Sequence, residues 1–499
     1  GTGTYTDQLS LSSSFVTSAD NNITVGNDAA GSPVINPAGD IDRVHIDADY
    51  TTLSKISITA PLPLDGSKRG IKVTADNFTA EYCTVSQTWQ GIWVTSGAAN
   101  SKVYHSTFYE NECGVNISPG TNADIYNCSS YNNTNIGIAI KANSLGGNAS
   151  ATIRECSVHS NVDGLWLGTG STGYYLLDAE VFDCDIYNNS HIGIRIFSQH
   201  APTPVIDNVA IIRNNRIYSL AGQSQGYGVF IDNNSDGVWL YNNTLYNNDC
   251  AAIYLMDGSD SHYCNNNIII VKNSATAYGI YTEGGTPFLA SDYNDIYRLG
   301  SGFAGYWGGD QAALEDWRSA SGLDTNSIRQ DPKFVEAASG EFHLMSTAGH
   351  WNSSTTSWDN DAETSPCIDA CAEGDDFSSE TWYHGYIRNQ GAYGNPVEAS
   401  RSPKAALFKW RGTVNTTWDD NDNWFPQIPS ITVGAASYAD VSIIVEASSN
   451  MPVMPNATDL SILNLEISTG NTCTTGAATY TINGNVTGAG TLIIGDAGT

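Results

Sequence analysis

Short apolar segments recur along this chain, and in each of them apolar residues alternate with a variable one. The shared phrase is a glycine, an aliphatic residue, any residue and a second aliphatic residue, which is threonine in the last copy. The copies begin at Gly70, Gly91, Gly114, Gly137, Gly164, Gly193, Gly228, Ala252 and Gly279. They are 21 to 35 residues apart, which is the period of a solenoid. Each phrase predicts a short strand with one buried face, and stacked coils would join these faces into one continuous core.

A second repeated phrase, such as Cys156-Ser157-Val158-His159, lies between these copies and predicts another strand in each coil. It is accompanied by two rows of like residues. The first row holds Cys83, Cys128, Cys156, Cys184, Asn215 and Asn243, and the second holds Asn111, Asn133, Asn161, Asn189 and Asn248. Equivalent residues on successive coils lie about 4.8 Å apart, so asparagine side chains can bond to one another and to turn backbone. We therefore expect structural ladders, with the cysteines as stacked thiols.

These repeats resemble those of right-handed parallel β-helix proteins, the superfamily that includes pectate lyases, polygalacturonases and surface proteins. The resemblance covers roughly residues 1 to 400 and concerns the fold more than the activity. It implies an all-β chain, a right-handed parallel β-helix solenoid with a C-terminal closing segment. A second, smaller β-rich module is expected after it.

Four segments follow from the pattern. The β-helix is expected over residues 1–298, and a closing segment with a short helix around Trp317 over residues 299–400. Such a segment is required because the last coil of a solenoid exposes apolar side chains and open strand edges. Residues 401–409 are expected to form a linker, and residues 410–499 a β-rich module, either a sandwich or a small solenoid. Both chain ends interrupt the pattern, which predicts part of a longer secreted protein with an incomplete last module.

The amino-acid composition restricts the classes of binding partner. The chain has 21 Lys and Arg against 52 Asp and Glu, a formal charge of −31, which argues against nucleic acid and anionic membranes. A polyanionic glycan would need Ca²⁺ to bridge it to this chain. No apolar run reaches transmembrane length, and no Cys/His spacing is typical of a zinc site. Of the ten cysteines, Cys367 and Cys371 are the expected disulfide pair.

The variable position of the main phrase should point outward, because its two neighbours point into the core. This outward row reads Lys72, Trp93, Asn116, Ala139, Trp166, Arg195, Phe230, Tyr254 and Tyr281. Its aromatic members are candidate binding residues for sugar rings or a partner protein: Trp93, Trp166, Phe230, Tyr254 and Tyr281. The alternative is that loops or the closing segment cover the row. A second outward row is expected to stack for stability: Tyr109, Tyr131, His159, Tyr187, Tyr218 and Tyr246.

Catalysis on this fold requires clustered acids for hydrolysis, or a base with charge neutralisation for elimination. The candidate cluster is Asp163, His191, Arg195 and His200. The paired-Asp and Gly-His-Gly motifs of polygalacturonase-like hydrolases are absent, and Phe197 stands where their lysine is expected. The alternative for Asp163 is that it starts a turn.

Lyases of the resembled superfamily use Ca²⁺ held by carboxylates. Two acidic turns offer oxygen ligands of the kind that this ion prefers: Asp257 with Asp260, and Asp419 with Asp420 and Asp422. Neither turn matches a full Ca²⁺ loop, and the alternative is that both are ordinary turns of an acidic chain. No other cofactor is expected.

The sequence thus favours an extracellular structural or adhesive protein of a surface layer, fibre or matrix that contacts glycans. Its expected partners are other copies of itself, other surface proteins and polysaccharide, without nucleic acid or membrane insertion. The first alternative is a polysaccharide lyase or glycoside hydrolase, and the second is a carbohydrate-binding protein without catalysis.

Overall fold

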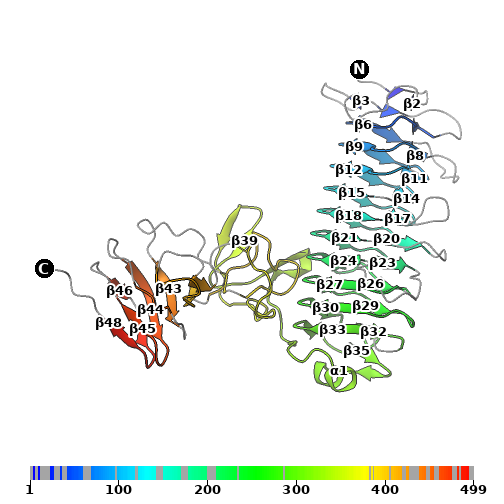
Figure 1. The fold of residues 1–499 in the computed structure, drawn as a ribbon. Coiled ribbons are helices and arrows are strands. Elements are labelled where there is room, and N and C mark those ends of the chain that lie inside the picture. The colour runs from blue at the N-terminus through cyan, green and yellow to red at the C-terminus, as the bar shows by residue number, and fades with distance from the viewer. Residues whose placement is uncertain are drawn as a thin grey trace. The chain divides into compact units, whose positions relative to one another are not determined.

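The computed structural model is almost entirely β (Figure 1). The residues that the structure describes are 4–5, 9–11, 23–26, 34–35, 42–59, 69–95, 98–118, 122–141, 150–169, 178–198, 210–232, 235–284, 287–380, 384–385, 387–403, 406–417, 423–425, 438–445, 450–453, 460–474, 480–482 and 485–493. The chain forms two compact units. The first is Gly1–Phe342 with Gln390–Gly394, and the second is His343–Asn389 with Asn395–Thr499.

The first unit is a parallel β-helix in which each coil contributes one strand to each of three sheets. The repeat predicted two of these strands, and the strand of sheet C is the third. Among the described residues, sheet A has 12 strands, sheet B 13 and sheet C 11. Sheet A holds β1 (Thr4–Tyr5), β4 (Val34–Ile35), β7 (Ser57–Thr59), β10 (Thr84–Ser86), β13 (Thr107–Tyr109), β16 (Ser129–Tyr131), β19 (Ser157–His159), β22 (Asp185–Tyr187), β25 (Arg216–Tyr218), β28 (Thr244–Tyr246), β31 (Ile268–Val271) and β34 (Asp295–Arg298). Sheet B holds β2 (Leu9–Leu11), β5 (Val44–Ile46), β8 (Arg69–Val73), β11 (Gln90–Val94), β14 (Cys113–Ile117), β17 (Ile136–Ile140), β20 (Asp163–Thr169), β23 (Ile192–Ser198), β26 (Tyr227–Ile231), β29 (Ala251–Leu255), β32 (Tyr278–Thr282), β35 (Phe303–Trp307) and β36 (Asp310–Gln311). Sheet C holds β3 (Ile23–Gly26), β6 (Thr51–Ser54), β9 (Thr79–Glu81), β12 (Lys102–Tyr104), β15 (Ala123–Tyr126), β18 (Ala151–Arg154), β21 (Ala179–Phe182), β24 (Ala210–Arg213), β27 (Val238–Tyr241), β30 (His262–Asn265) and β33 (Phe288–Asp292).

The glycine of the main phrase is the second residue of the sheet B strand, and two coils approach each other closely there. A Cβ atom built on Gly91 would lie 2.3 Å from the carbonyl oxygen of Gly114, and one on Gly137 would lie 2.7 Å from that of Gly164. Such separations are far below van der Waals contact, so a side chain would push the coils apart. The repeated glycine is therefore a packing requirement of the coil spacing.

Asparagine ladders hold the corners between the sheets. The backbone N–H of Asn111 donates to Asn133 Oδ1 at 3.0 Å, and that of Asn133 donates to Asn161 Oδ1 at 3.0 Å. Asn161 continues the series to Asn189, whose Nδ2 also donates to the carbonyl oxygen of Val158 at 3.0 Å. Each side chain thus satisfies buried backbone groups on the coils beside it, and the predicted ladder is confirmed.

The cysteine row is confirmed as a column of buried thiols: Cys83, Cys128, Cys156 and Cys184. The thiol of Cys128 donates to the carbonyl oxygen of Val103 at 3.4 Å, the same kind of bond to the preceding coil that the asparagines make. Burial raises the pKa of Cys83 to about 11, so this thiol stays protonated near neutral pH. The row then changes to asparagine at Asn215 and Asn243 and runs on to Asn267 and Asn294.

Residues in the left-handed backbone region precede the ladder positions. Asn127 (φ 51°) stands before Cys128, and Asn132 (φ 54°) before Asn133. This conformation costs a non-glycine residue about 1 kcal/mol, and it turns the chain sharply from one sheet to the next. Asparagine tolerates it best, which explains the many Asn-Asn pairs in the sequence.

One end of the solenoid is closed within the first unit. Strand β36 pairs antiparallel with β35, and helix α1 (Leu314–Ser321) follows. Trp317 of this helix is fully buried against the last coil, and its Nε1–H donates to Asp324 Oδ2 at 2.8 Å. The expected helix around Trp317 is present. The parallel strands of sheet B continue as far as β35, which ends at Trp307.

The outer face of sheet A is covered near this end. Phe342, in β38 (Glu341–Leu344), packs on Tyr218, and β38 pairs with β37 (Phe334–Glu336), which a 3₁₀ turn, Ala337–Ser339, joins to it. Residues 390–394 also lie on this sheet, because Asn214 Nδ2 donates to the carbonyl oxygens of Ala392 and Gly394 at 3.0 and 2.8 Å. Among the described residues, these contacts cover part of sheet A and do not reach the outer face of sheet B.

The second unit contains a short hairpin and further sheets. The hairpin is β39 (His350–Asn352) with β40 (Ser357–Asp359). The other strands are β41 (Ala406–Trp410), β42 (Trp424–Phe425), β43 (Tyr438–Val445), β44 (Leu460–Ile467), β45 (Thr472–Thr474), β46 (Tyr480–Ile482), β47 (Val486–Thr487) and β48 (Thr491–Ile493). Trp410 and Trp424 are buried edge to face with ring centroids 5.0 Å apart. The pairing of β41, β43, β44 and β46 is parallel, as in a small solenoid. In the described part of the chain, no helix has the length and apolar character needed to span a membrane.

The asparagine ladder yields a stability prediction. Asn161→Ala removes an acceptor of the Asn133 backbone N–H and of its side-chain amide, and it leaves the buried N–H unsatisfied. We expect the free energy of unfolding to fall by about 2–4 kcal/mol, measured by urea unfolding followed by circular dichroism. Asn135→Ala, at an exposed position two residues after Asn133, is the matched control. It should change the free energy of unfolding by less than about 0.5 kcal/mol. Equal losses of unfolding free energy in the two variants would contradict a stabilising role of the asparagine ladder.

Candidate functional site

The outward row lies on one face of sheet B in continuous register. Lys72 pairs with Trp93, Trp166 with Arg195, and every other member with its neighbour on the next coil. The row extends beyond its predicted ends to His45 and Tyr306. The sequence alternation thus placed these side chains correctly, because a strand has only two faces and the aliphatic neighbours occupy the inner one.

The second half of the row is a column of stacked rings. Ring centroids are 4.8 Å apart between Phe230 and Tyr254, 4.9 Å between Tyr254 and Tyr281, and 4.5 Å between Tyr281 and Tyr306. The planes are parallel to within 11°. Each ring therefore offers its faces to its neighbours and its edge to the outer surface, where the tyrosines also carry their hydroxyl groups.

A shorter column of aromatic residues begins the same strands. Tyr278 stacks on Phe303 with centroids 5.2 Å apart, and Tyr227 meets Phe230 edge to face at 5.2 Å. Together the two columns form the aromatic patch, whose half-buried members are Tyr227, Phe230, Tyr254, Tyr278, Tyr281, Phe303 and Tyr306. The sequence signal for the second column is the aromatic residue immediately before the first residue of the phrase. The four-residue pattern did not include this position.

Acidic side chains bind the hydroxyl groups of the patch. Tyr254 donates to Glu283 Oε1 at 2.5 Å, and Tyr278 donates to Asp310 Oδ1 at 2.9 Å. Burial, with this bond to Asp310, raises the pKa of Tyr278 to about 12, so the phenol remains a donor at neutral pH. The patch thus has an apolar body with a rim of carboxylates.

The two tryptophans of the row lie against cations instead. The guanidinium carbon of Arg69 is 4.0 Å from the ring centroid of Trp93, and that of Arg195 is 4.7 Å from Trp166. Lys141 lies on Trp166 as well, with its Nζ atom 5.3 Å from the centroid. A sugar ring could stack on the indole faces that these cations cover only by displacing the cations. Binding by the five candidate aromatic residues stays a prediction.

Three of the four candidate catalytic residues meet on this face. His191 Nδ1 lies 3.0 Å from Asp163 Oδ1, and Arg195 lies three residues beyond Ile192, which pairs with Asp163. Arg195 donates from Nε and Nη2 to Asp232 Oδ2 at 2.8 and 2.6 Å. Asp232 was missed from the sequence because it follows its strand one coil further on. His200 lies outside the described residues.

Burial distinguishes the members of this cluster. The side chain of His191 is 54% exposed, whereas that of Asp163 is 6% exposed. Burial raises the pKa of Asp163, and His191 and then Arg195 oppose that shift. A buried carboxylate therefore orients an exposed imidazole, and a neighbouring guanidinium is held by a second buried carboxylate.

The second outward row stacks as expected along sheet A. Ring centroids are 5.1 Å apart between Tyr131 and His159 and 4.6 Å between His159 and Tyr187. Its last member, Tyr246, packs beneath Phe342. Because the closing segment covers the end of this row, its stacking serves stability.

Among the described residues, the acidic turn of Asp257 and Asp260 does not form a metal site. Asp257 and Asp260 are exposed, and among the described residues no group of three or more His, Cys, Asp and Glu side chains could hold a metal ion. The acidic turn of Asp419, Asp420 and Asp422 lies outside the described residues. Cys367 and Cys371 are buried thiols in the structure, and the Cys371 thiol donates to the carbonyl oxygen of Asn389 at 3.2 Å. Their disulfide stays a prediction.

Comparison with known proteins gives matches to two families and to several solved structures. The family described as "Right handed beta helix region" matches residues 44–181 and 145–315, and one described as "Disaggregatase related" matches residues 309–371. The A-module of mannuronan C-5 epimerase AlgE6 from Azotobacter vinelandii is 14% identical, with 61% of this chain and 82% of that chain covered and a TM-score of 0.46. Pectate lyase Pel9A is 15% identical, with 78% and 84% covered and a TM-score of 0.42. No curated protein matches the chain.

The first family match extends from residue 44 to residue 315, more than half of the chain, and coincides with the stacked coils. The repeat, the three parallel sheets and this match agree. The chain belongs to the right-handed β-helix family.

Proposed function

We propose that this protein is an extracellular glycan-binding β-helix protein with an adhesive or structural role, and that the outer face of sheet B is its binding surface. The observation that carries the proposal is the aromatic patch, seven half-buried rings in two adjoining columns. A contiguous, partly exposed aromatic surface on a rigid sheet is typical of a binding site.

The arrangement of the rings decides how a glycan would lie. Ring faces are taken up by stacking, so the bound chain would contact ring edges and hydrogen-bond to the phenol and carboxylate groups at Tyr254, Glu283, Tyr278 and Asp310. Successive coils repeat at about 4.8 Å, close to the length of one sugar residue, so an extended chain would run across the strands along the column.

Charge narrows the class of glycan for this surface. The rim of the patch is acidic and the chain carries a formal charge of −31, so a neutral polysaccharide is favoured over a polyanion. The structural part of the proposal is that the solenoid is one module of an assembly with copies of itself or with other surface proteins.

A second candidate function is a polysaccharide lyase or glycoside hydrolase, and the contact of Asp163 with His191 favours it. If Nδ1 carries the ring proton, it donates to Asp163 and leaves Nε2 as an exposed acceptor, which is how a general base is oriented. Arg195, on the same face, would stabilise negative charge on the substrate, although Asp232 already neutralises it in part.

The binding proposal predicts a selective loss in the aromatic patch. The double variant Tyr254→Ala/Tyr281→Ala should weaken binding of a neutral polysaccharide at least about tenfold, because it removes two central rings and one phenol–carboxylate edge. Affinity electrophoresis against neutral and acidic polysaccharides measures this.

The matched control is Tyr131→Ala, which removes one ring from the stack on sheet A. It should leave binding unchanged. Equal weakening in both variants, or binding that survives in the double variant, would exclude the aromatic patch as the surface.

The enzymatic alternative predicts product formation that depends on His191. Neutral and acidic polysaccharides are incubated with the protein, with and without Ca²⁺, and reducing ends and unsaturated products are measured. His191→Gln should reduce any activity at least about a hundredfold, since general acid–base catalysis contributes 10²–10⁴-fold. Activity that persists in this variant would place the chemistry elsewhere, and Asp178→Asn, at an exposed turn of the neighbouring sheet, is the control.

The buried Asp163 predicts a pH-dependent stability difference. Its pKa is raised in the folded state, so the folded chain binds this proton more tightly than the unfolded chain. Stability from this group is therefore present below the unfolded pKa of about 3.9 and is lost as pH rises through the raised folded pKa. The free energy of unfolding of Asp163→Asn minus that of wild type should rise over this window and be flat above it, as measured by urea unfolding at several pH values. If this difference in unfolding free energy falls as pH rises, the pKa of Asp163 is lowered on folding and the prediction is wrong.

A further inference from the structure

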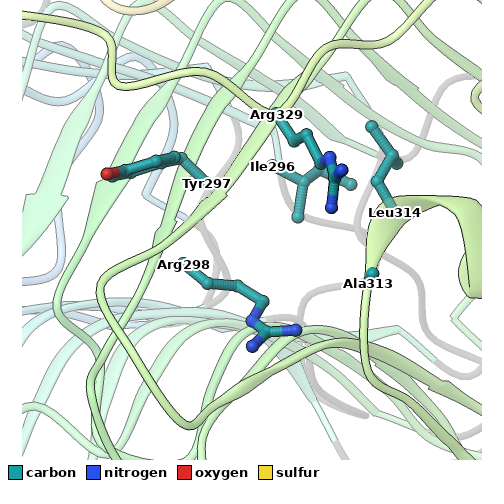
Figure 2. A pocket seen from close by; sticks show the side chains of 6 residues that line it. All are labelled: Ile296, Tyr297, Arg298, Ala313, Leu314 and Arg329. Carbon is teal, nitrogen blue, oxygen red and sulfur yellow. The ribbon is translucent and has the colours of Figure 1, made fainter.

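A cavity of about 390 Å³ lies at the closed end of the solenoid, between β34 and the start of α1. Its lining residues are Ile296, Tyr297, Arg298, Ala313, Leu314 and Arg329. Figure 2 shows the guanidinium groups of Arg298 and Arg329 pointing into the space between the strand and the helix. Two arginines in one cavity are notable in a chain with 21 basic and 52 acidic residues. The cavity lies at the end of sheet A and is distinct from the aromatic patch.

Arg298 is fixed in place and retains an unused donor. Its Nη1 donates to the carbonyl oxygen of Ala312, and its Nη2 donates to that of Gly300 at 3.0 Å. Its Nε is buried and has no hydrogen-bond partner among the described residues. A buried donor without an acceptor is costly, and it leaves the positive charge of this guanidinium only partly compensated by its two carbonyl contacts.

Arg329 provides the second charge and is available. Its Nε lies 3.1 Å from Glu315 Oε1, and the side chains of both residues are more than half exposed, at 58% and 54%. An ion pair so accessible to water contributes little, so a better acceptor can replace the glutamate. The planar guanidinium is suited to carboxylate and sulfate oxygens, which it can bind with two parallel bonds.

The first turn of α1 adds to the positive potential. The helix begins at Leu314, and its first N–H groups have no partners within the helix. Asp316 Oδ2 accepts from the N–H of Ala313 at 3.0 Å and, with Glu315, offsets part of this potential. The two arginines therefore carry the site, and the helix start supports it.

We infer that this cavity binds the oxyanion group of a sugar-sized ligand, such as the carboxylate of an acidic monosaccharide or the end residue of an acidic glycan. The volume is within the range of small-molecule sites and is larger than an inorganic anion needs. The acidic remainder of the chain does not forbid this, because salt screens charges beyond about 8 Å while direct arginine contacts persist. The inference does not rest on the glycan contact proposed for sheet B.

The test is calorimetric titration of the full chain at constant ionic strength. The probes are glucuronate and galacturonate, with glucose as the neutral analogue and inorganic sulfate and phosphate as bare anions. We expect the acidic sugars to bind and glucose not to bind. Arg329→Gln, at an exposed position that the fold tolerates, should weaken binding at least about tenfold, because a charge-assisted bond is lost. Glu315→Gln should strengthen it by removing the competing carboxylate.

Arg213→Gln is the matched control, because it removes the same charge from an ion pair with Glu180 on sheet C. It should bind the acidic sugars as wild type does. Binding that is unchanged in Arg329→Gln, equally weakened in Arg213→Gln, or absent for every anion would overturn the site. Equal affinity for bare sulfate or phosphate would overturn the assignment of a sugar ligand. Loss of neutral-glycan binding at sheet B leaves all these outcomes unaffected, so the two proposals fail separately.

Discussion

The structure depends on one constraint, the hydrogen bonding of each coil to the next through parallel strands about 4.8 Å apart. This spacing places every residue directly beside its equivalents on the neighbouring coils. Groups that can pair with their own kind are therefore favoured at each position: aliphatic side chains inside, asparagine at the corners and aromatic rings outside. The glycine of the main phrase follows from the same constraint, since a Cβ atom on Gly91 would meet the carbonyl oxygen of Gly114.

The ladders show how this spacing solves the problem of buried polar groups. A sharp corner takes backbone groups out of the strands and buries some of them, and asparagine on the next coil supplies the missing acceptor, as Asn161 does for Asn133. Where the row holds cysteine, the thiol donates to the preceding coil in the same way. Polar residues in the core of this solenoid are thus part of its architecture, and their presence there does not indicate a catalytic centre.

The outer face of sheet B shows the functional consequence. Stacking turns single aromatic residues into a continuous column. It also brings together residues far apart in the chain, such as Asp163, which contacts His191, and Asp232, which contacts Arg195. Sequence periodicity gave the column, because alternation fixes the side that a residue faces. It could not give Asp232, nor the contacts of Arg69 with Trp93 and of Lys141 with Trp166, because these depend on side-chain reach between coils and on turns of variable length.

The sequence by itself determined the solenoid, the two ladders, the inner and outer faces of the main strand and the acidic charge of the chain. These are periodic properties, and a repeat that is read once applies to every coil. Only the tertiary structure decided that each coil has a third strand, that the closing segment covers part of sheet A, and that Arg298 and Arg329 share a cavity. The physical reason is that these features join segments without a common period, through packing and charge contacts that no local pattern encodes.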